Sequence, residues 1–186
     1  MVFLLVTAAA LLLGLLLGGR LSALADLRLR AVWLFYIAIA LQIVAFPSGV
    51  LPWHMGDVPA RVFWLISYAC VGAAALLNRR VAGAPVVALG MLLNLAAIVA
   101  NGGHMPALPG AHEAAGIHSR LYNNSIADAD PHLAWLVDRW AAPGWIPLGN
   151  VYSVGDLVLA VGTFAVVLSA MNVRVRLPRA ARAGRA

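Results

Sequence analysis

An acidic residue near the start of an apolar segment is the first feature of this sequence that could do chemistry. Asp156 is the one acidic residue associated with the apolar segment 151–171. A carboxylate deep in lipid is costly, so such a residue is expected to be functional. Ser153 lies three residues earlier, which also fits a capping box at the start of a helix. With Asn150 and Tyr152, these residues predict either a polar ligand-binding rim or a helix cap.

A second polar group opens the connection 101–150. The sequence Asn101-Gly-Gly-His-Met-Pro106 contains two glycines, which allow unusual backbone angles, and Pro106, which stops a preceding helix. Asn101 fits a helix C-cap, and it fits equally a binding role shared with His104. Long connections in small bundles usually carry function. The connection is therefore the first place to look for a site.

Histidines could also form a metal site, and all of them lie in the connections between apolar segments. No pair has a helical ligand spacing followed by the supporting residues of a known metal motif. We therefore predict no metal and no cofactor. The residues concerned are His54, His104, His112, His118 and His132.

The composition predicts the environment that must hold these residues. Hydrophobic residues make up 63% of the 186 residues and charged residues 11%, a balance far from that of a soluble domain. The net charge of +6 comes from arginines in short segments between apolar runs and in a tail. Membrane orientation explains that placement, so we predict no nucleic-acid partner. Cys70 lies inside an apolar run and is interpreted as a packing residue.

Apolar segments of nearly membrane-spanning length define the predicted fold. We predict an all-α, polytopic membrane bundle of five transmembrane helices that forms a single unit over residues 1–171. The first segment has no positive residue before Val2 and no Ala-x-Ala site, so it is interpreted as a retained helix and not a signal peptide. The predicted spans are about 2–18, 31–47, 62–77, 84–100 and 151–171.

The distribution of arginine predicts the topology. Ten of the thirteen arginines lie after the first, third and fifth segments, whereas Arg61, Arg120 and Arg139 lie on the other side with most acidic residues and all histidines. Cytoplasmic connections accumulate arginine, so we predict a cytoplasmic-membrane protein with its N-terminus outside. The basic tail 172–186 is predicted to be disordered in the cytoplasm, near anionic lipid headgroups.

The long outer connection is expected to contain one short helix. Residues 107–129 lack a clear period and are interpreted as irregular and mobile. Asp130 and Pro131 fit the N-cap and first position of a helix over about 131–141. Its apolar face would lie on the membrane surface or on the mouth of the bundle. That face comprises Leu133, Leu136, Val137 and Trp140.

Four residues inside the apolar segments predict how the helices pack. Gln42 and Asn94 are expected to form hydrogen bonds between helices, and Gly155 and Gly162 to provide a face for close packing.

The sequence resembles a bacterial integral-membrane family catalogued as a domain of unknown function, DUF5317. The resemblance rests on Asn101–Pro106, Ala134-Trp-Leu-Val-Asp138, Asn150-Val-Tyr-Ser-Val-Gly-Asp156 and the arginine-rich first connection, and it extends over nearly the whole chain. It implies no activity.

A partial resemblance to lipoprotein signal peptidases implies an enzyme. Leu136-Val-Asp138-Arg139 and Ser153-Val-Gly-Asp156 are similar to the two aspartate motifs of that family, in the same order. The resemblance implies that Asp138 and Asp156 act as the base and acid of an aspartyl protease. Trp135 and Ser153 stand where the family has Asn, and its intervening Asp-Phe signature is missing.

These observations favour a binding or assembly protein over an enzyme. In this hypothesis the bundle anchors an outer region, 101–156, that contacts a lipid or an envelope protein in addition to the bilayer itself. The alternative is the aspartyl protease with Asp138 and Asp156. A transporter is disfavoured, because no inverted repeat is visible and no charged residue lies near the middle of a span.

Overall fold

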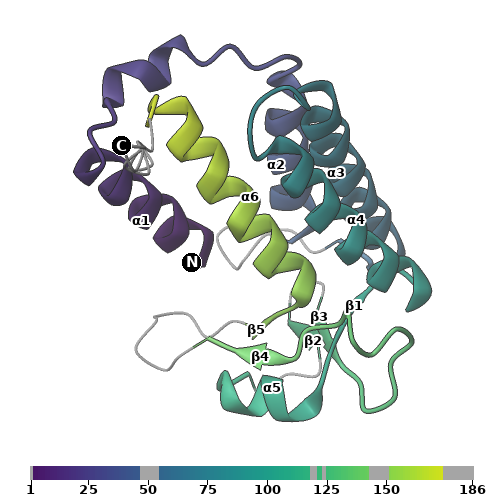
Figure 1. Ribbon diagram of the computed structural model, residues 1–186. Helices are drawn as coiled ribbons and strands as arrows, with labels where there is room; N and C mark the ends of the chain where they lie inside the picture. Colours follow the sequence, from purple (N-terminus) through teal and green to yellow (C-terminus); the bar gives the residue numbers. More distant parts are fainter. Residues whose placement is uncertain (1, 47–54, 118–120, 123–124, 143–150, 174–186) are drawn as a thin grey trace, which may run out of the picture.

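Each predicted apolar segment forms a helix in the computed structural model, which describes residues 2–46, 55–117, 121–122, 125–142 and 151–173. Figure 1 shows the arrangement. The long helices are α1 (Val2–Leu16), α2 (Trp33–Ala45), α3 (Asp57–Leu77), α4 (Ala84–Ala100) and α6 (Val154–Ala170). The basic tail that the sequence predicts lies, from residue 174 on, outside the described residues.

The lengths of these helices determine which of them could cross a membrane. Among the described residues, α3 alone is long and apolar enough to do so, and four further apolar helices have 10–17 residues. The prediction of five membrane-spanning helices is therefore not confirmed. The helix predicted at 62–77 begins earlier, at Asp57. Asp57 is favourable in a first helical turn, and Pro59 is tolerated there because the first turn needs no backbone donor.

The long helices contact one another in the order α2, α3, α4, α6, α1. The α4–α6 contact is the closest, because glycines let the two backbones approach. A Cβ atom at Gly90 would lie 2.7 Å from Leu159 N, and one at Gly162 would lie 2.6 Å from Val87 N. A Cβ atom at Gly155 would overlap the side chain of Asn94. The predicted close-packing role of Gly155 and Gly162 is confirmed.

Polar side chains join neighbouring helices, as the sequence predicts. Gln42 Nε2 on α2 donates to Ser67 Oγ on α3 at 3.1 Å. Asn94 Nδ2 on α4 donates to Asp156 Oδ1 on α6 at 2.8 Å. Both side chains thus form a hydrogen bond across a helix interface.

One end of the bundle, here called the arginine end, contains the 3-10 helix η1 (Leu21–Asp26) and the turn 78–83. Arg20 N donates to Met171 O at 3.0 Å, which ties the chain after α1 to the end of α6. The side chain of Asn78 bonds the main chain of Arg30, which ties the segment before α2 to the end of α3.

The opposite end, here called the loop end, carries a short helix and two small sheets beneath the helix ends (Figure 1). The helix is α5 (Pro109–Ala114). A three-stranded sheet has the order β1 (Met105–Ala107), β3 (Ser125–Ala127), β2 (Leu121–Tyr122), and a two-stranded sheet pairs β4 (Trp140–Ala141) with β5 (Val151–Tyr152). The all-α prediction therefore needs correction to mostly helical with short strands, and the prediction that 107–129 is irregular is wrong.

The helix predicted over 131–141 does not form. Residues 132–136 are turns, Leu133 has a positive φ of 53°, and Asp138 pairs with Ala107. Asp130 is no helix cap, because no helix follows it, and its backbone N–H donates to Asp128 Oδ1 at 3.0 Å. Backbone bonds to α4 and β1 are available only in the folded chain, and they outweigh the helical period of the sequence.

A small apolar core joins the loop end to the helices. Ala97, Ile98, Met105 and Leu136 are buried together. Partly buried residues of α3 and α6, among them Trp64 and Val154, pack against them. This core fixes the loop end on the bundle, so that side chains from both can form one site.

Candidate functional site

Asp156 begins the site as part of a helix cap. Ser153 is the N-cap of α6, and its Oγ accepts from Asp156 N at 3.1 Å while Ser153 N donates to Asp156 Oδ2 at 3.0 Å. The predicted capping role of this pair is confirmed. A carboxylate at this position is also stabilised by the N-terminal end of the helix dipole.

Asn94 joins this cap to α4. Its Nδ2 donates to Asp156 Oδ1 at 2.8 Å, and its Oδ1 accepts from Ser153 Oγ at 2.8 Å. Asn94 is 1% exposed. Asn94 thus joins α4 and α6 in one hydrogen-bonded group at the mouth of α6.

Asp138 lies nearby, on the strand-like segment that pairs with β1. Asp138 N donates to Pro106 O and Leu108 N donates to Asp138 O, both at 2.9 Å. Its side chain is buried and accepts from Ser125 Oγ at 3.2 Å through Oδ2. Ser125 Oγ lies 3.2 Å from Nε2 of His112, which is also buried. The result is a chain of side chains from α5 through β3 to Asp138.

Burial and neighbouring charge determine the protonation of the side chains in this hydrogen-bonded series. The pKa of Asp138 is raised to about 7, chiefly by burial and also by the charge of Asp156, while the Ser125 hydrogen bond lowers it. Burial lowers the pKa of His112. Nδ1 of His112 has no hydrogen-bond partner among the described residues. We therefore assign the imidazole proton to Nε2, which donates to Ser125.

The two aspartates that the sequence singles out are therefore close enough to interact electrostatically. One is buried with a pKa near neutrality, and the other is held in a cap by hydrogen bonds. A carboxyl group that titrates near neutrality can give or take a proton under ordinary conditions. Whether the pair acts on a substrate stays a prediction.

Asn101 and His104 make structural contacts. Asn101 is the C-cap of α4, as predicted, and its Nδ2 donates to Ala97 O at 2.7 Å. It also accepts from His132 N at 2.8 Å and donates to His132 O at 2.9 Å. These bonds occupy the amide, so Asn101 orders the loop end by fastening the segment 131–136 to the bundle.

His104 belongs to a second polar group at the start of α3. Its Nε2 lies 3.4 Å from Asp57 Oδ1, and Arg61 forms an ion pair with Asp57 at 3.0 Å. Arg61 also donates to Gly102 O at 2.8 Å. The positive φ angles of Gly102 and Gly103, 70° and 93°, match the predicted glycine turn.

Tyr152 lies beside the site, immediately before the cap of α6. Its ring is tilted against Trp140, with centroids 6.0 Å apart, and its carbonyl accepts from Arg139 N at 3.1 Å. Asn150, the remaining residue of the predicted rim, lies outside the described residues.

The sequence did not single out Ser125 as a site residue, and it presented His112 only as one of several loop histidines. Their contact with Asp138 depends on the pairing of β3 with β1. Such a pairing leaves no local pattern. Among the residues that the structure describes, no three His, Cys, Asp or Glu side chains gather in a way that could hold a metal ion.

Comparison with known proteins assigns the chain to a family. Residues 26–168 match the model of a family of unknown function, DUF5317. The chain belongs to DUF5317. The predicted resemblance is confirmed, and the match covers the loop end and the part of the arginine end from residue 26 on. No curated protein and no solved structure matches the chain.

Proposed function

We propose that this member of DUF5317 is a multi-pass protein of the cytoplasmic membrane that binds a partner at the outer face through its loop end. The observation that carries the proposal is an exposed apolar surface on an ordered backbone. Leu133, Trp135 and Trp140 are 41%, 57% and 39% exposed. Exposed large apolar side chains on a fixed backbone are typical of binding surfaces, and tryptophan is common among the residues that contribute most to binding.

The backbone beneath this surface is fixed from two sides. Asn101 bonds both main-chain groups of His132. The pairing of β4 with β5 holds Trp140 opposite Tyr152. A surface that is already ordered loses little conformational entropy on binding.

The exposed faces of the helices support the membrane part of the proposal. Large apolar side chains project outward from the long helices, for example Leu16 at 82%, Tyr36 at 69%, Leu92 at 57% and Val161 at 64% exposure. In water these surfaces would be unfavourable, whereas a bilayer provides an apolar solvent for them. The helices shorter than α3 would fit if the bilayer thins locally around them.

The charge of the two ends supports the orientation. Arg20, Arg28, Arg30, Arg79 and Arg80 lie at the arginine end. Loops rich in arginine stay in the cytoplasm, so the loop end would face outward. The test is labelling of single cysteines in a Cys70→Ala background with a membrane-impermeant maleimide. His132→Cys should react in intact cells, and Ser22→Cys only after permeabilisation. The reverse pattern would contradict the orientation.

Binding itself can be tested with a photo-crosslinking amino acid at position 135. The matched control is position 33, because Trp33 is 59% exposed and lies at the other end of the bundle. We expect a discrete protein or lipid adduct from position 135 that position 33 does not give. Equal, unspecific lipid adducts from both positions would show that Trp135 is only an anchor in the headgroup region.

A second candidate function, an aspartyl hydrolase, is favoured by the effect of Asp156 on Asp138. One carboxyl with a pKa near neutrality beside a second, negatively charged one is the arrangement of an acid–base pair. The test is cleavage of a transmembrane reporter peptide by the reconstituted protein. Asp138→Asn and Asp156→Asn should each abolish cleavage, and Asp130→Asn, an exposed carboxylate at the same end, should not. Undiminished cleavage by Asp138→Asn would exclude this candidate.

A further inference from the structure

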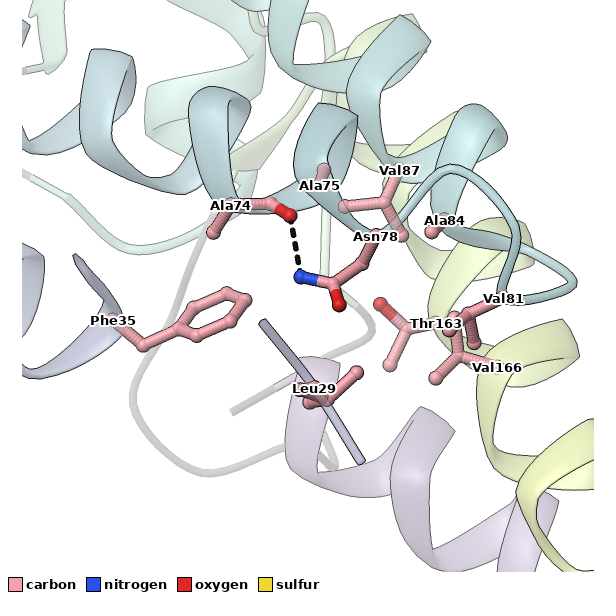
Figure 2. A pocket seen from close by; sticks show the side chains of 10 residues that line it. All are labelled: Leu29, Phe35, Ala74, Ala75, Asn78, Val81, Ala84, Val87, Thr163 and Val166. Carbon is pink, nitrogen blue, oxygen red and sulfur yellow. Dashed lines mark hydrogen bonds between the residues drawn. The ribbon is translucent and has the colours of Figure 1, made fainter. Parts of the chain in front are cut away.

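Two cavities at the arginine end share part of their wall. The first has a volume of about 180 Å³ and lies between α2, α3, α4 and α6. Figure 2 shows the mainly apolar side chains that line it, among them Leu29, Phe35 and Val166. Asn78 and Val81 line both cavities.

The second cavity has a volume of about 320 Å³ and differs in its chemistry. It is formed where the segment before α2 meets the turn between α3 and α4. Four of the eight residues that line it are arginines: Arg28, Arg30, Arg79 and Arg80.

Asn78 brings the two pairs of arginines together. Its Oδ1 accepts from Arg30 N at 2.7 Å, and its Nδ2 donates to Arg30 O at 2.9 Å and to Ala74 O at 2.7 Å. Figure 2 shows the last of these bonds. Asn78 is 6% exposed, so breaking this set would leave buried polar groups unpaired. The segment that carries Arg28 and Arg30 is therefore fixed beside Arg79 and Arg80.

No residue that the structure describes neutralises the charge of this cavity. None of the four arginines forms an ion pair with another described residue. Asp26 is the one acidic residue at the arginine end of the described chain, and it does not line the cavity. Like charges held close together favour an anion between them, and guanidinium groups match phosphate oxygens geometrically.

We propose that the arginine end binds an anionic phospholipid, with the phosphate in the arginine-lined cavity and part of an acyl chain in the apolar cavity. The inference rests on the membrane embedding proposed above and does not depend on binding at the loop end. The shared wall at Asn78 and Val81 places a charged site next to an apolar one, which is the arrangement of a lipid headgroup and its chain. Basic pockets between membrane helices are suited to anionic headgroups.

The apolar cavity distinguishes a lipid from free phosphate. A phosphate ion would use the arginines alone, and the adjoining apolar cavity would play no part. A phospholipid would occupy both cavities, so that filling the apolar cavity would weaken phospholipid binding. Thr163 of α6 lines only the apolar cavity, and it offers a place to add bulk without changing charge.

The experiment is native mass spectrometry of the full chain in mild detergent. The protein is titrated with dioleoyl phosphatidylglycerol, dioleoyl phosphatidylcholine and glycerol phosphate. We expect phosphatidylglycerol to bind most tightly. Arg30→Gln and Arg79→Gln should each weaken it by about fivefold, the effect of one arginine near an anionic headgroup. Arg20→Gln, which removes one exposed charge at the same end outside the cavity, is the matched control and should leave binding unchanged.

Thr163→Leu should weaken the binding of phosphatidylglycerol and leave the binding of glycerol phosphate unchanged. Equal binding of the two phospholipids, or equal losses in Arg79→Gln and Arg20→Gln, would overturn the proposal. Glycerol phosphate binding as tightly as phosphatidylglycerol, with no effect of Thr163→Leu, would assign the cavity to a soluble phosphate and also overturn it. Helicity and monodispersity of each variant confirm its fold. If the protein is extracted from the membrane fraction but does not distinguish the two phospholipids, this proposal fails and the proposed function of the loop end stays intact.

Discussion

Asn94 Nδ2 donates to Asp156 Oδ1 at 2.8 Å, across the interface of α4 and α6. The same amide accepts from Ser153, so one buried side chain holds both members of the α6 cap. The position of Asp156 matters beyond the cap, because its charge raises the pKa of Asp138. Helix packing and the protonation of the loop end are thereby connected through Asn94.

Asn94→Leu should destabilise the protein by about 2–3 kcal/mol, because it removes both the donor to Asp156 Oδ1 and the acceptor of the Ser153 hydroxyl at a buried position. Gln42→Leu is the matched control, since it removes a bond between two neutral side chains and should cost about 1 kcal/mol. Unfolding in detergent, followed by circular dichroism, measures both. Equal losses would indicate that the charge of Asp156 adds nothing to the bond.

Gly155→Ala should destabilise the α4–α6 contact by about 1–3 kcal/mol, because the added methyl group would occupy the space of the Asn94 side chain. Gly72→Ala should be neutral or slightly stabilising, since nothing lies within 4 Å of a Cβ atom there and alanine favours the helix. The two melting temperatures give the comparison. A Gly155→Ala protein as stable as Gly72→Ala would show that the helices can separate without cost.

Stability should depend on pH through Asp138. Its pKa rises from 3.8 to about 7 on folding, so between these values the folded state binds a proton that the unfolded state has lost. This contribution is present in full below pH 4 and is lost as the pH rises through 7, by roughly 4 kcal/mol in all. Chemical unfolding measured from pH 5 to 8 should show the decline, and Asp138→Asn should remove it.

His112 contributes with the opposite sign. Burial lowers its pKa, so the unfolded state binds the proton more tightly and its contribution to stability is lost as the pH falls. Comparing wild type with Asp138→Asn at each pH isolates Asp138, because His112 is present in both. Asp130→Asn should keep the slope of the wild type. A wild-type curve parallel to that of Asp138→Asn would contradict the assignment.

Asn101→Ala should release the turn 132–136 from α4, because it removes both bonds to the main chain of His132. We expect a loss of about 1–2 kcal/mol and faster amide hydrogen exchange over residues 132–140 than in wild type. Asn101→Asp keeps an acceptor for His132 N and loses the donor, so its effect should be intermediate. Unchanged exchange in Asn101→Ala would show that β4 and β5 suffice to hold the turn.

The sequence predicted those parts of the fold that local pattern controls. Each apolar run became a helix because burying or sheltering its side chains requires a backbone that satisfies its own hydrogen bonds. Ser153 and Asp156 were recognisable as a cap because their spacing is a local property of the chain. Asn94 was recognisable as a bonding residue because an amide inside an apolar run needs a partner.

The loop end could not be predicted in the same way. Residues 131–141 have a helical period, yet their backbone is bonded by Asn101 and Pro106, which lie more than twenty residues earlier. Ser125 became a partner of Asp138 through the parallel pairing of β3 with β1.

The sequence by itself determined the helices, the cap of α6, the glycine-rich contact and the separation of charge along the chain, because each follows from residue type and short spacing. Tertiary structure alone decided that His112, Ser125 and Asp138 meet, that Asp156 acts on Asp138, and that Asn78 gathers four arginines around one cavity. Such contacts form between residues far apart in the chain. They depend on which surfaces the folded chain brings together, and no local pattern encodes that.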